Sequence, residues 1–251
     1  MKIELAQIDI TLGDKERNLN RAIKLIQSSN AELILFPELF TTGFDFANFK
    51  KLSEKVPGET TDAISDVCGG VFVGGTIIER DENKIYNTFV LVGKDGILAK
   101  YRKIHLFEGE KNYFSQGDEI RVVDTKLGKL ALAICYDIRF PELFREFMKQ
   151  NAEVVIVSAE FPDPREEHWR ALLRARAIEN QYFVIATNRV GRDPKHTYFG
   201  GSVAIGPWGD VIVSGGNEES ILKAEIDISD VVKIRREFPV LGDALESYKR
   251  L

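Results

Sequence analysis

One stretch of sequence, residues 130–142, decides the fold class: Leu130-Ala131-Leu132-Ala133-Ile134-Cys135-Tyr136-Asp137-Ile138-Arg139-Phe140-Pro141-Glu142. Its apolar beginning, 130–134, predicts a strand that is buried on both faces, and residues 143–149 have the spacing of a helix. A strand that passes through a short turn into a helix is the building unit of α/β proteins. The sequence therefore predicts an α/β protein in which Cys135 lies where a buried strand ends.

The same alternation extends outward in both directions. The remaining strands are predicted at 2–10, 33–36, 71–78, 85–92, 97–101, 121–124, 154–157, 182–186, 203–205, 211–213 and 222–226. The remaining helices are predicted at 14–28, with Asp14 as N-cap, and at 60–67, 166–180 and 229–236. Apolar strands such as 33–36 indicate burial on both faces, whereas polar turns at 81–83 and 94–96 indicate hairpins. We expect a layered mixed-sheet α/β protein, with two packed sheets because the strands are so many. In the helix 166–180, Trp169, Leu172, Ala175 and Ile178 are expected to form the core face.

Composition excludes several classes of protein. The chain has 251 residues and contains no linker, repeat or low-complexity segment, so a single domain over 1–251 is expected. Apolar residues make up 44% and charged residues 29%, as is ordinary for soluble globular proteins. A formal charge of −5 without a basic block argues against a nucleic-acid partner. Charges interrupt the N-terminal residues, which predict a strand and neither a signal peptide nor a membrane span.

The cysteine count indicates a reducing compartment. Cys68 and Cys135 are the only cysteines, and they are far apart in sequence. Two isolated thiols form neither a disulfide framework nor a zinc site, so we expect a cytoplasmic protein.

Cys135 has two interpretations. A free thiol after an apolar strand is commonly an inert core residue. A thiol at a strand end is also held rigidly beside a backbone N–H that could bind an oxyanion, which suits a nucleophile. The polar residues Asp137 and Arg139 that follow weaken the first interpretation. A nucleophilic thiol needs a base, and the three histidines, His105, His168 and His196, leave a Cys–His pair open.

A carboxylate is the alternative base, provided that a dry site raises its pKa. Glu38 stands in Phe36-Pro37-Glu38-Leu39-Phe40, directly after an apolar strand. It is either this base or an exposed loop acid. Lys103 stands in Tyr101-Arg102-Lys103-Ile104-His105-Leu106-Phe107 and is either an oxyanion partner or a surface lysine.

Taken together, three blocks resemble the signatures of the nitrilase, or carbon–nitrogen hydrolase, superfamily. The blocks contain Glu38, Lys103 and Cys135 and occur in the same order and with similar wide separation. The resemblance runs from residue 1 to the tail and implies a Glu–Lys–Cys triad. It also implies a second catalytic glutamate, for which Glu110 is the best match and Glu108 the competitor. It further implies a four-layer αββα sandwich of two mixed sheets and a homodimer or higher oligomer, with the tail, 238–251, at the interface.

The implied reaction is amide hydrolysis through a thioester. Glu38 takes the proton of the thiol, Cys135 attacks, and Lys103 with the backbone N–H of Tyr136 stabilises the oxyanion. Glu38 then protonates the departing ammonia and activates a water, while Glu110 positions substrate or assists proton transfer. The covalent intermediate divides one difficult step into two. No metal or organic cofactor is required.

The residues after Cys135 are most similar to the omega-amidase and deaminated-glutathione amidase branches. The first branch implies a carboxylate-bearing amide such as 2-oxoglutaramate, and the second implies deaminated glutathione. Simple aliphatic amides and N-carbamyl compounds are further alternatives. Arg139 is close enough to bind a substrate carboxylate, unless it pairs with Glu142 or Asp137. Phe161 is expected to form an apolar wall of the pocket.

Two alternatives belong to different classes of protein. One is a non-catalytic binding protein on the same fold, against which the retention of all three signature residues speaks. The other is a nucleotide-binding module, for which the sequence offers no glycine-rich phosphate loop, because Gly69-Gly70 and Gly74-Gly75 have the wrong spacing.

Overall fold

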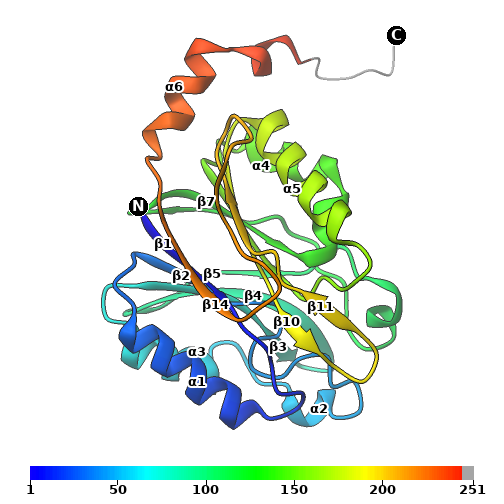
Figure 1. Ribbon diagram of the computed structural model, residues 1–251. Coiled ribbons are helices and arrows are strands. Elements are labelled where there is room, and N and C mark those ends of the chain that lie inside the picture. The colour runs from blue at the N-terminus through cyan, green and yellow to red at the C-terminus, as the bar shows by residue number, and fades with distance from the viewer. Residues whose placement is uncertain (245–251) are drawn as a thin grey trace.

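Two mixed six-stranded sheets form the middle of the molecule in the computed structural model, which describes residues 1–244 (Figure 1). The first sheet has the order β14 (Ser220–Glu225), β1 (Lys2–Gln7), β2 (Leu33–Leu35), β3 (Phe72–Asp81), β4 (Lys84–Gly93) and β5 (Gly96–Arg102). The second has the order β13 (Val211–Ser214), β12 (Val203–Ile205), β9 (Phe183–Asn188), β8 (Val154–Ala159), β7 (Gly128–Ile134) and β6 (Val122–Thr125). A separate hairpin is made by β10 (Val190–Arg192) and β11 (Thr197–Phe199).

Both sheets follow one plan. Each sheet contains three neighbouring parallel strands, β1-β2-β3 and β9-β8-β7, and each outer strand pairs antiparallel with the strand next to it. Parallel neighbours require crossover connections. Helices α1 (Lys15–Ser28) and α3 (Glu59–Cys68) make these crossovers in the first sheet, and α4 (Pro141–Lys149) and α5 (Glu166–Asn180) make them in the second.

The helices cover the outer faces and the sheets pack on each other. Figure 1 shows α1 and α3 against the first sheet and α4 and α5 on the far side of the second. Between the sheets, β3 contacts β8, while β4 and β5 contact β7. Apolar side chains from both sheets, including Leu5, Leu35, Ala131 and Val155, share one buried core. The predicted four-layer arrangement is confirmed.

Local sequence explains how two of the helices form. Asp14 caps α1, because its side chain accepts a hydrogen bond of 3.1 Å from the N–H of Arg17, as predicted. Helix α5 has its predicted bounds, but of the four residues in its predicted core face only Trp169 is buried, and Leu172 and Ala175 are half-buried. Trp169, Leu173 and Ala177 are buried, whereas Ile178 is 46% exposed. The buried positions follow each other at intervals of four residues, which turns Ile178 towards the loop at Gly209.

The remaining helical segments are short. They are α2 (Phe49–Leu52), η1 (Glu108–Asn112), η2 (Cys135–Arg139), α6 (Ser229–Glu237) and η3 (Val240–Asp243). Within residues 1–244, no helix is both long and apolar enough to cross a membrane.

A close approach between β3 and residues 36–40 fixes the segment that carries Glu38. The N–H of Phe36 donates to Gly74 O at 2.8 Å, and the N–H of Leu39 donates to Thr76 Oγ1 at 2.7 Å. Gly75 lies between these contacts, and a Cβ added there would lie 2.8 Å from the ring of Phe40 and 3.1 Å from Cβ of Phe36. The absence of a side chain at Gly75 therefore allows this approach.

We expect Gly75→Ala to lower the free energy of unfolding by about 1–3 kcal/mol, the usual cost of overpacking. It should also lower kcat, because the displaced segment carries Glu38. Gly70→Ala is the matched control, since a Cβ there meets nothing within 4 Å. The control should change stability by less than about 0.5 kcal/mol in urea unfolding. Equal behaviour of the two variants would contradict the packing argument.

Candidate active site

One cavity of about 620 Å³ is lined by all seven residues that the sequence singled out. They are Glu38, Lys103, Glu110, Cys135, Tyr136, Arg139 and Phe161. Glu38 comes shortly after β2 in the first sheet, Cys135 directly follows β7 in the second, and Lys103 directly follows β5. Residues far apart in sequence thus meet where strands of both sheets end.

Cys135 lies on a tight turn between strand and helix. It is the first residue of η2, it is buried, and its φ is +42°, a conformation that residues with a side chain seldom adopt. Asp137 holds the turn, because its carboxylate accepts hydrogen bonds from the N–H of Ile134 at 2.9 Å and from the hydroxyl of Tyr101 at 2.8 Å. Such a turn presents a side chain at the top of a sheet beside free backbone N–H groups.

Glu38 has no exposed surface, and three donors hold its carboxylate. Oε1 accepts hydrogen bonds from Lys103 Nζ and from Asn87 Nδ2, each at 2.7 Å. Oε2 accepts one from the main-chain N–H of Glu160 at 3.0 Å. The carboxylate is therefore fixed in orientation, and the exposed-acid interpretation is wrong.

Lys103 lies between two carboxylates and is equally buried. Its Nζ donates to Glu38 at 2.7 Å and to Glu110 Oε1 at 2.8 Å. Burial favours its neutral form, but Glu110 and Glu38 outweigh burial and raise the pKa of Lys103 well above its usual value. The side chain is thus a fixed ammonium at neutral pH, and the surface-lysine interpretation is wrong.

The structure brings Glu110 and not Glu108 to this cluster. Glu110 is buried, and its second oxygen, Oε2, accepts a hydrogen bond of 2.7 Å from the N–H of Phe107. Glu108 is exposed. Burial raises the pKa of Glu110 to about 7, with Lys103 opposing and Glu38 adding to the effect.

The surroundings of Cys135 favour its protonated thiol, so a nucleophilic attack by Cys135 requires a base. Burial and the charge of Glu38 raise the pKa of the thiol well above its usual value, although Lys103 acts in the opposite direction. The resting thiol is therefore protonated, and the carboxylate of Glu38 is the neighbour suited to take the proton. His105 is engaged elsewhere, since its Nδ1 lies 2.8 Å from Asp137 Oδ1 and its ring stacks on Phe140 at 3.6 Å. The geometry favours Glu38 over a Cys–His pair.

Three further cations line the cavity. Arg139, Arg165 and Lys195 have no acidic partner within 4 Å among residues 1–244, and neither Glu142 nor Asp137 pairs with Arg139. Each lies over an aromatic ring: Arg139 over Phe161 at 5.4 Å, Arg165 over Phe107 at 5.2 Å, and Lys195 over Phe46 at 5.5 Å. Arg139 Nη2 instead lies 3.3 Å from His168 Nδ1. Unpaired cations on a cavity wall can bind an anionic group of a ligand.

Several residues of the site were missed in the sequence. These residues are Asn87, Glu160, Arg165 and Lys195. All but Glu160 carry no local signal, because an Asn inside a strand and charges in loops are common. Arg165 and Lys195 flank the cavity only through the folding of distant loops. A polar residue at the end of an apolar strand was the one usable signal, and it applies to Glu160, which follows the run 154–159.

The described part of the chain contains no group of three or more His, Cys, Asp or Glu side chains arranged to hold a metal ion.

Fold and site together define a class: α/β hydrolytic enzymes that combine two packed sheets with a buried carboxylate–lysine–cysteine cluster. The model of the family described as carbon-nitrogen hydrolase matches residues 2–236, and the chain belongs to this family. It is 39% identical over 249 residues to the 2-oxoglutaramate amidase of Bacillus subtilis, with 96% of each chain covered. It is 38% identical over 245 residues to omega-amidase NIT2 of Xenopus tropicalis, with 90% and 88% covered. Among solved structures, the CN-hydrolase superfamily protein XC1258 from Xanthomonas campestris superposes with a TM-score of 0.91 at 29% identity, with 98% of each chain covered.

We expect kcat/KM for a neutral amide to rise with pH through about 7, the pKa of Glu110. The ionised carboxylate can accept from both Lys103 and Phe107 N–H, whereas the protonated form must give up one of these contacts. Below pH 7 the cluster should therefore lose its geometry. Initial rates measured between pH 5.5 and 8.5 would show the rise.

The Glu110→Gln variant should lose most of its activity, and its kcat/KM should no longer rise with pH. The control is Glu160→Gln, because the pKa of Glu160 is also raised to about 7, chiefly by burial. Protonated Glu160 can carry its proton on Oε1, which has no partner, and still accept from Arg189. Its Gln variant should therefore keep the rise. A Glu110→Gln variant that retains the wild-type profile would refute the assignment.

Proposed function

We propose that this enzyme hydrolyses the terminal amide of a small dicarboxylate monoamide, such as 2-oxoglutaramate, to the diacid and ammonia. The observation that carries the proposal is the buried Lys103 ammonium bonded to both Glu38 and Glu110 beside a thiol at a strand end. This arrangement supplies a base, an oxyanion partner and a nucleophile in a cavity large enough for one small molecule.

The reaction begins when Glu38 takes the thiol proton and Cys135 Sγ attacks the amide carbon. Lys103 and the main-chain N–H of Tyr136 stabilise the negative charge that develops on the amide oxygen. Glu38 returns the proton to the leaving nitrogen, ammonia departs, and a thioester remains. Glu38 then removes a proton from a water molecule that attacks the thioester, and the protonated thiol is restored as the acid leaves. Glu110 keeps Lys103 charged and in place during both halves.

The substrate class is supported by the relatives and by the charges of the cavity. One reported relative is named 2-oxoglutaramate amidase and the other omega-amidase NIT2. Arg139, Arg165 and Lys195 offer unpaired positive charge on the cavity wall, and Phe161 and Tyr136 add apolar surface to it. A carboxylate bound by the cations would direct the amide at the other end of a short chain to Cys135.

The same-class alternatives are amidases for deaminated glutathione, simple aliphatic amides or N-carbamyl compounds. A non-catalytic binding protein on this fold is the alternative from another class. Against it stands the protonated, buried thiol with an adjacent carboxylate base, an arrangement that binding alone does not need.

Trapping the thioester tests the chemistry. The intact enzyme is mixed with succinamate and quenched in acid, and the mass of the Cys135 peptide is measured. An acyl adduct on Cys135 and release of ammonia are expected, and Cys135→Ala should show neither. Binding of succinamate without adduct or ammonia would support the non-catalytic alternative.

We expect Arg139→Ala to raise KM for succinamate by about 10- to 100-fold, the scale of a lost charge-assisted contact of about 1.5–3 kcal/mol. KM for propionamide, which has no carboxylate, should change less than about threefold. Arg121→Ala is the matched control, because Arg121 does not line the cavity. Equal loss on both substrates would contradict a carboxylate contact and favour a simple-amide amidase.

We also propose that residues 1–251 form one domain and that the chain assembles as a homodimer or higher oligomer. Figure 1 shows α6 projecting from the body of the protein beyond β14. Trp208 and Phe238 lie together with ring centroids 5.6 Å apart and are about half exposed, as are Ile178 and Val240. A second copy of the chain would cover this apolar surface. Sedimentation of the intact chain would give the oligomeric state.

Within the proposed tail, 238–251, residues 245–251 lie outside the described part of the chain. A cytoplasmic location is likewise our proposal, supported by the free state of both cysteines, Cys68 and Cys135.

A further inference from the structure

A buried ion pair, Glu160 with Arg189, adjoins the catalytic cluster and has no role in the reaction described above. Glu160 follows β8 and lines the cavity, and Arg189 follows β9. Arg189 Nη1 donates to Glu160 Oε2 at 2.9 Å, and both side chains are almost completely buried. Burying two opposite charges costs free energy of desolvation, and the pair often adds no net stability. A role in positioning neighbouring groups would explain why the pair is present.

The main chain of Glu160 contacts the proposed base directly. Its N–H donates to Glu38 Oε2 at 3.0 Å and is the donor that holds this oxygen. The other oxygen, Oε1, is held by Lys103 and Asn87. The direction of the Glu160 N–H therefore fixes how the carboxylate of Glu38 is rotated about its axis, and so which oxygen faces Cys135.

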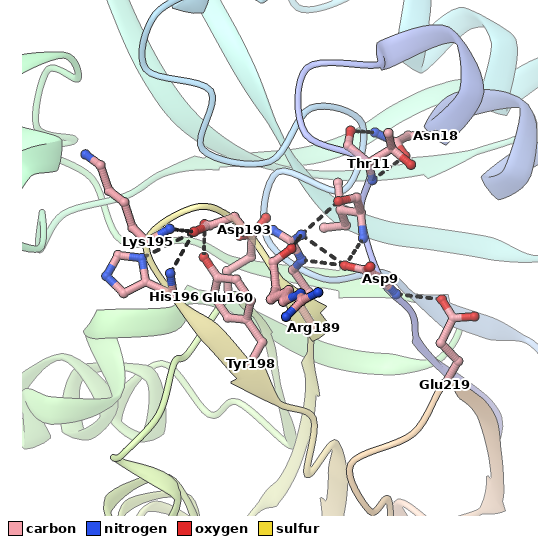
Figure 2. A network of polar contacts seen from close by, with 12 residues as sticks. Asp9, Thr11, Asn18, Glu160, Arg189, Asp193, Lys195, His196, Tyr198 and Glu219 are labelled. Atoms are coloured by element: carbon pink, nitrogen blue, oxygen red, sulfur yellow. Dashed lines mark hydrogen bonds and ion pairs between the residues drawn. The ribbon is translucent and has the colours of Figure 1, made fainter.

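Arg189 is itself held from several sides, as Figure 2 shows. Its Nη2 donates to Ile10 O at 2.8 Å and to Asp9 Oδ1 at 3.0 Å, and its guanidinium lies 4.6 Å from the centre of the Tyr198 ring. The hydroxyl of Tyr198 donates to Asp193 Oδ2 at 2.7 Å. Arg189 is thus a rigid anchor, and the carboxylate of Glu160 is the group that it holds nearest to Glu38.

The two oxygens of the Glu160 carboxylate are used unequally. Oε2 accepts from Arg189, while Oε1 is buried and has no hydrogen-bond partner among residues 1–244. A side chain that served stability alone would gain from having both oxygens bonded. Only the contact with Arg189 is made. Arg189 also donates its main-chain N–H to Ala159 O at 3.1 Å, so it holds both the side chain of Glu160 and the peptide whose N–H reaches Glu38.

We propose that Glu160 is a positioning residue, which through its ion pair with Arg189 aims its own main-chain N–H at Glu38 and so orients the catalytic base. The inference rests on the proposed function, in which Glu38 is that base. Without the pair, the peptide is held only by the contact of Ala159 O with the N–H of Arg189 and by the contacts of Phe161 with Asn188. The N–H of Glu160 is then aimed less firmly at Oε2 of Glu38. The carboxylate then turns away from the thiol, which slows proton transfer without altering the cationic wall that binds substrate.

The test compares three substitutions of Glu160 in the intact enzyme. Glu160→Ala removes the contact and should lower kcat for succinamate about 10- to 100-fold, the scale of a misplaced catalytic group, with KM changed less than threefold. Glu160→Gln keeps an oxygen that can accept from Arg189 and should retain kcat within about threefold. Glu160→Asp withdraws the carboxylate from Arg189 at little change in volume. The kcat of Glu160→Asp should fall as far as that of Glu160→Ala. Glu160→Asp therefore tests the proposal if Glu160→Ala does not fold.

Glu54→Ala is the matched control. Glu54 is also a buried glutamate with a cationic neighbour, Lys15 at 3.3 Å, but it holds the start of α3 and does not line the cavity. After correction for the folded fraction by circular dichroism, it should leave kcat unchanged even if it lowers the melting temperature. A loss of kcat equal to that of Glu160→Ala would show a general effect of buried charge and would overturn the proposal.

Alkylation of Cys135 by iodoacetamide gives a second readout that does not depend on substrate binding. Its rate should fall in Glu160→Ala and remain near wild type in Glu160→Gln, with Cys68 in the same sample as internal reference. Two results would overturn the proposal: a folded Glu160→Ala variant with wild-type kcat, or a Gln variant as impaired as the Ala variant. Failure of the proposed function is distinguishable, since Cys135→Ala and Glu38→Gln would then leave ammonia release intact.

Discussion

The structure of the site depends on one buried ammonium group held between two carboxylates. A charge without solvent is costly unless opposite charges and hydrogen bonds surround it, and Lys103 satisfies this condition only at its contacts with Glu38 and Glu110. The three groups therefore fix one another. The same cluster raises the pKa of the Cys135 thiol, chiefly through burial and the charge of Glu38, so the nucleophile is stored in its protonated form until the base acts.

This constraint explains why the enzyme needs two sheets. Glu38 and Lys103 follow strands of the first sheet and Cys135 follows a strand of the second, so the proposed base and the proposed nucleophile meet only when the two sheets pack. The apolar core between the sheets supplies the packing, and side chains such as Leu35 and Ala133 contribute to it from both sides. Contacts such as the N–H of Glu160 on Glu38 cross between the sheets as well. Catalytic geometry and hydrophobic packing are thus parts of one arrangement.

The charged side chains of the cavity include a buried cluster and three unpaired cations. The carboxylates of Glu38 and Glu110 belong to the buried cluster around the thiol. The unpaired cations Arg139, Arg165 and Lys195 lie over aromatic rings on the cavity wall. An anionic group that bound beside the carboxylates would be repelled, while an anion at the cations would be attracted. This distribution of charge supports the proposed substrate, because it favours one orientation of a molecule with a carboxylate at one end and a neutral amide at the other.

The sequence by itself determined the layered α/β class, the N-cap at Asp14, the bounds of α5, and Glu38, Lys103 and Cys135 as the residues to examine. Apolar runs, capping residues and polar residues at strand ends are local signals, and the wide spacing of the three blocks carried the resemblance to the family. Only the tertiary structure showed that Glu110, and not Glu108, contacts Lys103. Only the tertiary structure showed that Arg139 pairs with neither Glu142 nor Asp137. It also showed that Ile178 is half exposed and that Glu160 pairs with Arg189. These outcomes depend on burial and, for Arg139 and Glu160, on partners 29 residues away. No local pattern encodes either, because the free energy of a charged side chain is set by the neighbours that folding brings to it.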